Sequence, residues 1–188
     1  MPVQPKPGTG AAPSRAKPDH LAELEKMTAE APAPERVCQK LAQILRVQRN
    51  EVALLRLEQG SLRFIYPTEL RAAGAIPLSS SAVAARTAST RIPLLSNSFS
   101  SVKHVSFFET VKLADGEQGA DQWPIQKIVS VPVADAQGKV LGVAQVSRKG
   151  LDPSLSGADF TGDDLKQLER AAEIIARMAF MQESAPLG

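Results

Sequence analysis

Several residue types that support particular functions are scarce in this 188-residue chain. It has one cysteine, Cys38, and two histidines, which excludes an intramolecular disulfide and is too few for a cysteine-based zinc site. Aromatic residues make up only 4% of the chain, and 22 basic residues face 20 acidic ones, for a net charge of +2. Nucleic-acid-binding proteins usually carry a basic surface or aromatic stacking platforms. We therefore expect no nucleic-acid partner and no metal site.

Long hydrophobic runs are missing as well. No apolar run approaches the roughly 18–20 residues that cross a bilayer, and residues 1–8 lack the apolar segment of a signal peptide. The single thiol fits a reducing compartment. We expect a cytoplasmic protein without membrane insertion. Hydrophobic residues still make up 43% of the chain, enough for the core of one domain with an extension.

Composition divides the chain into three parts. The first 34 residues contain seven of the 14 prolines and predict a flexible extension, with a short helix over 20–29 that Asp19 caps. The folded domain is expected over 35–182 and a flexible C-terminus over 183–188.

Hydrophobic periodicity predicts a mixed α and β domain. Apolar residues at helical spacing predict an amphipathic helix up to about Val47. Apolar or alternating runs predict two β-hairpins. The expected hairpin strands are 52–57 with 62–66, and 128–134 with 140–147. The other expected elements are a serine-capped helix over 79–89, a strand over 92–95, a helix around 105–113 and a final helix from Thr161 to about Gln182.

Two residues of the second hairpin constrain its surroundings. Gly142 inside a strand indicates a bulge or the close approach of another backbone. Pro132 has no N–H to donate, so it requires an edge or bulge position. In the first hairpin, alternation predicts that Leu62, Phe64 and Tyr66 share one face.

The order helix, hairpin, variable middle, hairpin, helix resembles that of a GAF domain, a small-molecule sensory and regulatory module. The segments that carry the resemblance are 76–93, 128–133 with 138–143, and 160–168. It covers roughly residues 35–182. The resemblance implies an α+β, PAS-related fold in which N- and C-terminal helices flank a central antiparallel β-sheet.

The resemblance also implies a ligand pocket between one sheet face and the loops of residues 79–130. There, Arg86 and the Lys103–His104 pair would suit an anion, and Trp123 offers a stacking surface. The candidate ligand-binding residues are Arg86, Asn97, Ser98, Lys103, His104, Trp123 and Ser130. The alternative is that the cations are solvated and Trp123 is loop packing. The residues do not identify the ligand or a cofactor. Ser147–Arg148 stand where the cyclic-nucleotide-binding subset carries Asn-Lys, which does not favour that ligand.

No motif indicates catalysis. Some GAF proteins are free-methionine sulfoxide reductases, whose cycle needs an attacking thiolate and a resolving cysteine. The only thiol here, Cys38, is expected in the first helix of the domain, away from the pocket. Its position also excludes covalent bilin attachment at the usual pocket cysteine. We therefore expect no enzyme activity and name no catalytic residue.

The final helix carries two neighbouring apolar stripes, whereas one is enough to cover a sheet. Many GAF domains dimerise through their terminal helices, so the resemblance implies a homodimer or a signalling partner protein. The candidate interface residues are Leu165, Leu168, Ala172, Ile175 and Ala179. The alternative is a broad helix that faces its own core. The sequence thus predicts a sensory module that binds a small molecule; a pure interaction module with a degenerate pocket is the alternative.

Overall fold

The protein is described by a computed structural model that places residues 19–101 and 123–182. Its centre is a six-stranded antiparallel sheet with the order β3-β2-β1-β6-β5-β4. The strands are β1 (Val52–Glu58), β2 (Ser61–Tyr66), β3 (Ala75–Pro77), β4 (Leu94–Ser96), β5 (Ile125–Ala134) and β6 (Val140–Lys149). The helices are α1 (His20–Met27), α2 (Pro34–Leu45), α3 (Val83–Thr90), α5 (Gly162–Ile175) and α6 (Ala179–Gln182). Short 3-10 turns are η1 (Thr28–Glu30), η2 (Arg49–Glu51), η3 (Thr68–Ala73), η4 (Phe99–Ser101) and η6 (Pro153–Leu155).

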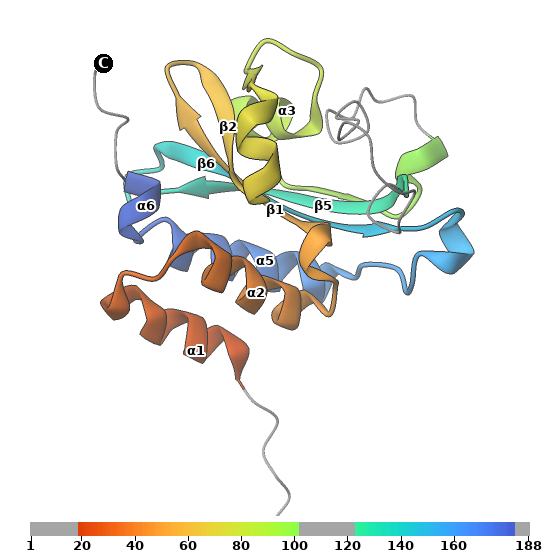
Figure 1. Ribbon diagram of the computed structural model, residues 1–188, viewed down its shortest axis with the longest axis horizontal. Coiled ribbons are helices and arrows are strands. Elements are labelled where there is room, and N and C mark those ends of the chain that lie inside the picture. Colours follow the sequence, from red (N-terminus) through yellow and green to blue (C-terminus); the bar gives the residue numbers. More distant parts are fainter. Residues whose placement is uncertain (1–18, 102–122, 183–188) are drawn as a thin grey trace, which may run out of the picture.

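The elements form three layers. Helices α1, α2 and α5 lie on one side of the sheet, and α3 lies on the other (Figure 1). This arrangement confirms the expected α+β architecture, in which helices flank an antiparallel sheet. No helix of residues 19–101 or 123–182 is long and apolar enough to span a bilayer. The helix expected around 105–113 lies outside the described residues.

The main core lies between the sheet and helices α2 and α5. Val37, Leu41 and Ile44 recur at helical spacing on α2 and are buried against Leu168 and Ile175 of α5. Each such side chain contributes about 1.5–3 kcal/mol by leaving water. The spacing of the apolar residues in the sequence therefore decides which face of each helix meets the sheet.

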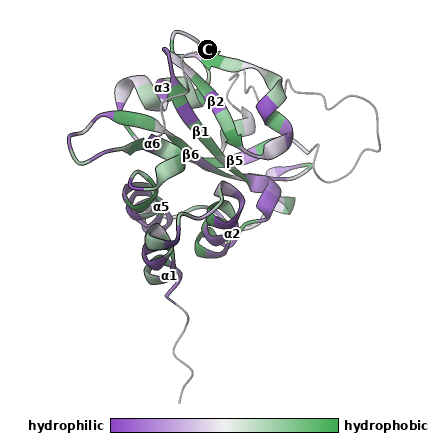
Figure 2. Ribbon diagram, turned by 60° about the vertical axis from the view of Figure 1, so that its left-hand side comes forward, coloured by the Kyte–Doolittle hydropathy of each residue, from purple (hydrophilic) through white to green (hydrophobic). Residues whose placement is uncertain are grey.

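Helix α1 forms an additional cover over α2 and α5 (Figure 2). The side chain of Asp19 accepts a hydrogen bond from Ala22 N, which confirms the predicted N-cap. Leu24 is fully buried in the helix-side core. Glu25 pairs with Arg177 at 2.6 Å, beyond the end of α5. The helix that the sequence assigned to the extension is thus packed on the domain.

Three of the five candidate interface residues are core residues of their own chain. Leu168, Ala172 and Ile175 are buried beneath the sheet, and Leu165 packs partly against the same core. Ala179 is exposed at the start of α6. This placement corrects the assignment of the three buried residues to an interface: one stripe of α5 meets the sheet and the neighbouring one contributes to the same cluster.

A bulge changes the predicted face of one residue in the first hairpin. The pairing of β2 with β1 shifts register between Leu54 and Leu55. Leu62 and Phe64 share one face, as predicted, and this face lies on the α3 side, but Tyr66 packs against the helix-side core. The prediction was wrong for Tyr66 because the extra residue of a bulge interrupts strict alternation.

The second hairpin confirms both constraints. A Cβ on Gly142 would lie 2.0 Å from the backbone oxygen of Leu55 on β1, so this is a close approach of two backbones. Strand β4 pairs only with residues 128–130 of β5, so no described strand lies opposite Pro132 on that side. Pro132 therefore occupies an edge position, as predicted.

Of three further predicted helix ends, one is confirmed and two are wrong. Thr161 and Asp164 form a capping box at the start of α5, which confirms the predicted cap. Helix α3 begins at Val83 without a side-chain cap, so the predicted serine cap was wrong. The final helix ends at Ile175 rather than near Gln182, and α6 follows as a separate turn.

Candidate ligand-binding site

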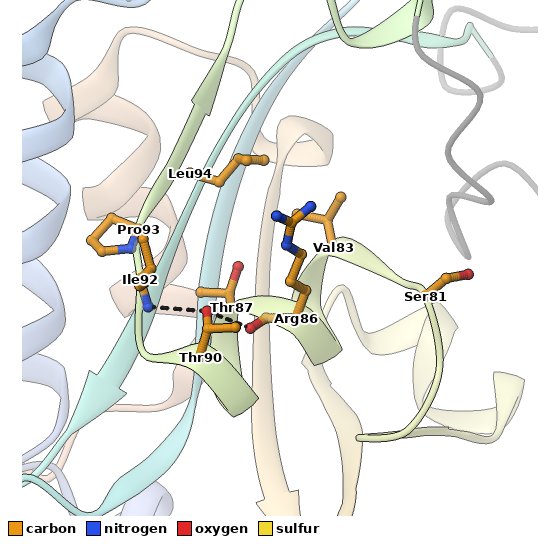
Figure 3. Close-up of a pocket in the computed structure, with 8 residues that line it drawn as sticks. All are labelled: Ser81, Val83, Arg86, Thr87, Thr90, Ile92, Pro93 and Leu94. Atoms are coloured by element: carbon orange, nitrogen blue, oxygen red, sulfur yellow. Dashed lines mark hydrogen bonds between the residues drawn. The ribbon is translucent and has the colours of Figure 1, made fainter.

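A cavity of about 120 Å³ lies between α3 and β4, on the sheet face opposite α2 and α5 (Figure 3). Helix α3 and the turn before it supply one wall, while β4 and the connection to it supply the other. The lining residues are Ser81, Val83, Arg86, Thr87, Thr90, Ile92, Pro93 and Leu94. The cavity is thus formed by residues of the segment 79–130, where the pocket was expected. Of the seven candidate ligand-binding residues, Arg86 is among the described residues that line it.

A buried polar cluster anchors the α3 wall to the sheet. The hydroxyls of Thr87 and Ser130 are 2.8 Å apart, and Gln145 Nε2 donates to Ser130 Oγ at 3.1 Å. All three residues are buried, so each hydrogen bond avoids the cost of an unpaired polar group in the interior. The cluster joins α3 to β5 and β6. Ser130 itself does not line the cavity, because Thr87 lies above it.

The turn from α3 to β4 is held by a second hydroxyl. Thr90 Oγ1 donates to Arg86 O at 2.8 Å and accepts from Ile92 N at 3.3 Å (Figure 3). Arg91 ends the helix in the left-handed conformation, with φ 59°. Ile92 then stands 67% exposed at the cavity rim. Both threonine hydroxyls of the lining are consequently engaged within the protein.

Arg86 is the one charged residue among the described residues that line the cavity. Figure 3 shows its side chain extending along the cavity toward Val83 and Leu94. Arg86 is exposed, and its guanidinium has no ion pair or hydrogen bond with the described part of the chain. A cation beside apolar walls is therefore the main electrostatic feature of this site.

Asn97 has a different role from the one predicted. Its Nδ2 donates to Phe160 O at 2.9 Å, and its Oδ1 accepts from Phe160 N at 2.8 Å. Both ends of the amide are therefore used by one backbone residue, 63 positions further along the chain. This corrects the assignment of Asn97 to ligand contact: it fastens the end of β4 to the segment that leads into α5.

Phe160 extends this link to α2. The Arg148 guanidinium lies over the Phe160 ring at 4.7 Å from its centroid, a cation–π contact. Arg148 Nη1 also donates to Arg46 O at 3.1 Å, where α2 ends. A continuous set of contacts therefore runs from β4 through Asn97 to the ends of α5 and α2.

The remaining candidate residues lie elsewhere. Ser98 is exposed just beyond Asn97, and Trp123 is 39% exposed before β5; neither lines the cavity. Lys103 and His104 lie outside the described residues. Sequence reasoning missed the apolar lining of 92–94, although Ile92 and Pro93 begin the predicted strand 92–95, shortly after the predicted helix.

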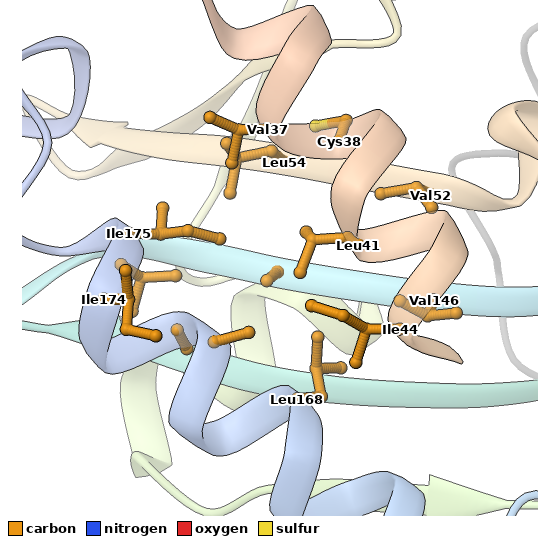
Figure 4. Packing of buried hydrophobic residues seen from close by; sticks show 14 of the residues in the cluster. Val37, Cys38, Leu41, Ile44, Val52, Leu54, Val146, Leu168, Ile174 and Ile175 are labelled. Carbon is orange, nitrogen blue, oxygen red and sulfur yellow. The ribbon is translucent and has the colours of Figure 1, made fainter. Parts of the chain in front are cut away.

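Cys38 lies on the opposite side of the sheet from the cavity. Its thiol is buried among Val37, Leu54 and neighbouring core residues (Figure 4). Burial raises the pKa of the Cys38 thiol, and the nearby Glu35 carboxylate adds to the effect. Among the described residues, no group of three or more His, Cys, Asp or Glu side chains could hold a metal ion.

Comparison with solved structures identifies the fold. Neither a family model nor a curated protein matches the sequence. The GAF domain of an Acinetobacter phosphoenolpyruvate-protein phosphotransferase is similar with a TM-score of 0.60 and 14% identity, over 87% of this chain and 93% of that chain. The corresponding GAF domain from Coxiella burnetii is similar with a TM-score of 0.58 and 13% identity, over 87% and 95%. The chain therefore has the fold of a GAF domain, as the sequence predicted.

An enzyme shares this fold. A type II free methionine-R-sulfoxide reductase from Thermoplasma acidophilum is similar with a TM-score of 0.51 and 14% identity, over 89% of this chain and 99% of that chain. This finding overturns the expectation that the chain is not an enzyme. That expectation rested on Cys38, the only thiol of the chain, lying away from the expected pocket; the fold itself leaves catalysis open.

Proposed function

We propose that this chain is a regulatory GAF module that binds a small molecule in the α3–β4 cavity and transmits binding to its terminal helices. The main observation behind this proposal is the cavity itself. It has a volume of about 120 Å³, apolar walls and one arginine that is not paired with any described residue. The similarity to the GAF domains of a phosphoenolpyruvate-protein phosphotransferase and of a two-component sensor histidine kinase supports this function.

The contacts of Asn97 support the transmission step. A ligand that moves β4 also moves Asn97, which directly follows the strand, and thereby the backbone of Phe160. Thr161, the N-cap of α5, is the next residue. Arg148 carries the same displacement to the end of α2. A ligand can shift this equilibrium only by its difference in affinity for the two arrangements.

The receiving surface of the proposed module includes α1. Helix α1 packs on α2 and α5. A dimer or partner contact through the terminal helices would therefore include α1 in the interface. We propose a second copy of the chain or a separate signalling protein as the recipient.

Thermal-shift screening against nucleotides, haem, amino acids and organic acids tests the binding step, because a ligand of the native state raises its stability. We expect at least one class to raise Tm in the wild type and not in Val83→Phe, which fills the cavity. Leu155→Phe is the control, since Leu155 is exposed on η6, outside the cavity lining. Shifts absent across the panel, or equal in Val83→Phe, would overturn the proposal. Free methionine sulfoxide is included as ligand and as substrate, and its turnover would replace the sensory function with an enzymatic one.

A further inference from the structure

We infer that the cavity ligand is a short-chain aliphatic monocarboxylate of about four to six carbons; this rests on the proposed function and specifies its ligand class. The chemistry of the lining leads to this class. Val83, Ile92, Pro93 and Leu94 supply apolar surface, and Arg86 supplies the charge. A guanidinium matches a carboxylate with two parallel N–H donors.

The volume limits the ligand body. A cavity of roughly 150 Å³ with apolar walls holds one benzene molecule, which has about six heavy atoms. A cavity of about 120 Å³ therefore accommodates a body of about three to five carbons, with the carboxylate outside at Arg86. A nucleobase with its sugar exceeds this space, as does haem.

The hydrogen bonds of the lining exclude a polar body. The Thr87 hydroxyl is paired with Ser130, and the Thr90 hydroxyl both donates and accepts within its own turn. The third lining hydroxyl belongs to Ser81, whose side chain points away from Arg86 and Leu94 (Figure 3). A hydroxyl or ammonium on the ligand would lose water without gaining a dedicated partner, which is unfavourable. Among the described residues, no carboxylate side chain lines the cavity to receive an ammonium. The site should therefore distinguish a fatty acid from the amino acid with the same carbon skeleton.

Arg86 is the specificity-determining residue in this assignment. It is the fourth residue of α3, and its backbone is held by the bond from Thr90 Oγ1 to Arg86 O. Its side chain is exposed, so substituting it leaves the core intact. Arg91 is a matched control: it is another exposed arginine of the same region and does not line the cavity.

The test is a titration of the ¹⁵N-labelled chain monitored by amide chemical shifts. The probes are 3-methylbutanoate, its neutral isostere 3-methylbutanamide, valine, and straight-chain carboxylates from acetate to octanoate. We expect saturable shifts in α3 and β4 with 3-methylbutanoate, and at least tenfold weaker binding of the amide and of valine. Affinity should peak at four to six carbons. Arg86→Gln should weaken 3-methylbutanoate binding at least tenfold, and Arg91→Gln should leave it unchanged.

The outcomes separate this inference from the proposed function. Equal binding of acid and amide, or an Arg86→Gln variant that binds as well as the wild type, overturns the carboxylate assignment. If no carboxylate binds but another class gives a thermal shift that Val83→Phe abolishes, the ligand class is wrong and the proposed function stands. If no class binds, both fall. Spectra of the free variants show directly that each one is folded.

Discussion

Replacing Asn97 tests how β4 is joined to α5. Asn97→Ala removes two hydrogen bonds at once, the 2.9 Å bond to Phe160 O and the 2.8 Å bond from Phe160 N. Phe160 is only 3% exposed, so water has little access to the two backbone groups left behind. Asn97→Asp keeps the acceptor for the N–H and loses the donor to the carbonyl.

The size of the effect follows from these contacts. A net hydrogen bond contributes about 1 kcal/mol, and each buried group left unpaired costs about 1–3 kcal/mol. We expect Asn97→Ala to lower the free energy of unfolding by about 3 kcal/mol and Asn97→Asp by about half as much. For a chain of this length, about 3 °C of Tm corresponds to 1 kcal/mol, so Asn97→Ala should lower Tm by about 9 °C.

Two measurements check this reasoning. Thermal unfolding gives the stability loss, with Gln137→Ala as an exposed-site control that should stay within about 0.5 kcal/mol of the wild type. Hydrogen exchange then asks whether a bound ligand still protects the amides of α5 in Asn97→Ala. A Tm loss below 2 °C would refute the structural role of Asn97. Unchanged ligand-dependent protection of α5 would refute its role in transmission.

Three further predictions concern the core. Gly142→Ala should lower the free energy of unfolding by about 3 kcal/mol or more, because its Cβ would lie 2.0 Å from a backbone oxygen of β1. The control is Gly162→Ala, which has open space around it. Its free energy of unfolding, measured by urea titration, should stay within about 1 kcal/mol of the wild type. Leu168→Glu should unfold the chain, as measured by circular dichroism, because Leu168 is fully buried. The control Leu165→Glu should remain folded. A Leu168→Glu variant that light scattering shows to be a folded monomer would indicate instead that the helix stripe is an interface. Burial raises the Cys38 pKa, so the thiol stays protonated in the native state at a pH where it ionises in the unfolded state. The free energy of unfolding should therefore fall as pH rises above about 8.5. Cys38→Ala should show a smaller fall over the same pH range. Iodoacetamide should accordingly label Cys38 only on unfolding, and rapid native labelling at pH 8 would contradict this.

Local periodicity accounts for most of the correctly predicted fold. The two hairpins and the helix α2 each carry a complete hydrophobic pattern within a few residues, and the turn at 135–138 supplies Gly138 at φ 79°. The misplaced features depend on distant contacts. The break after Ile175 has no glycine or proline to mark it, and the bulge that turns Tyr66 depends on the register of β1.

The site residues also differ in whether they depend on local sequence or on distant contacts. Arg86 was a candidate pocket residue because the resemblance to GAF domains implies a pocket along residues 79–130, and it lines the cavity. The role of Asn97 was not predictable locally, because its partner is Phe160 in a distant loop. Ser130 was a candidate ligand-binding residue, but only the packed structure shows that its hydroxyl is paired with that of Thr87.

The position of Pro132 affects how copies of this chain meet at high concentration. Strand β4 leaves β5 uncovered by any described strand beyond Ser130, and an uncovered strand edge is a template for joining sheets of different molecules. Proline supplies no N–H, so the apolar stretch Val131-Pro132-Val133 presents an interrupted row of donors. Strand β4 is too short to cover this part of β5. We expect Pro132 to disfavour pairing of the exposed edge with the sheet of another molecule.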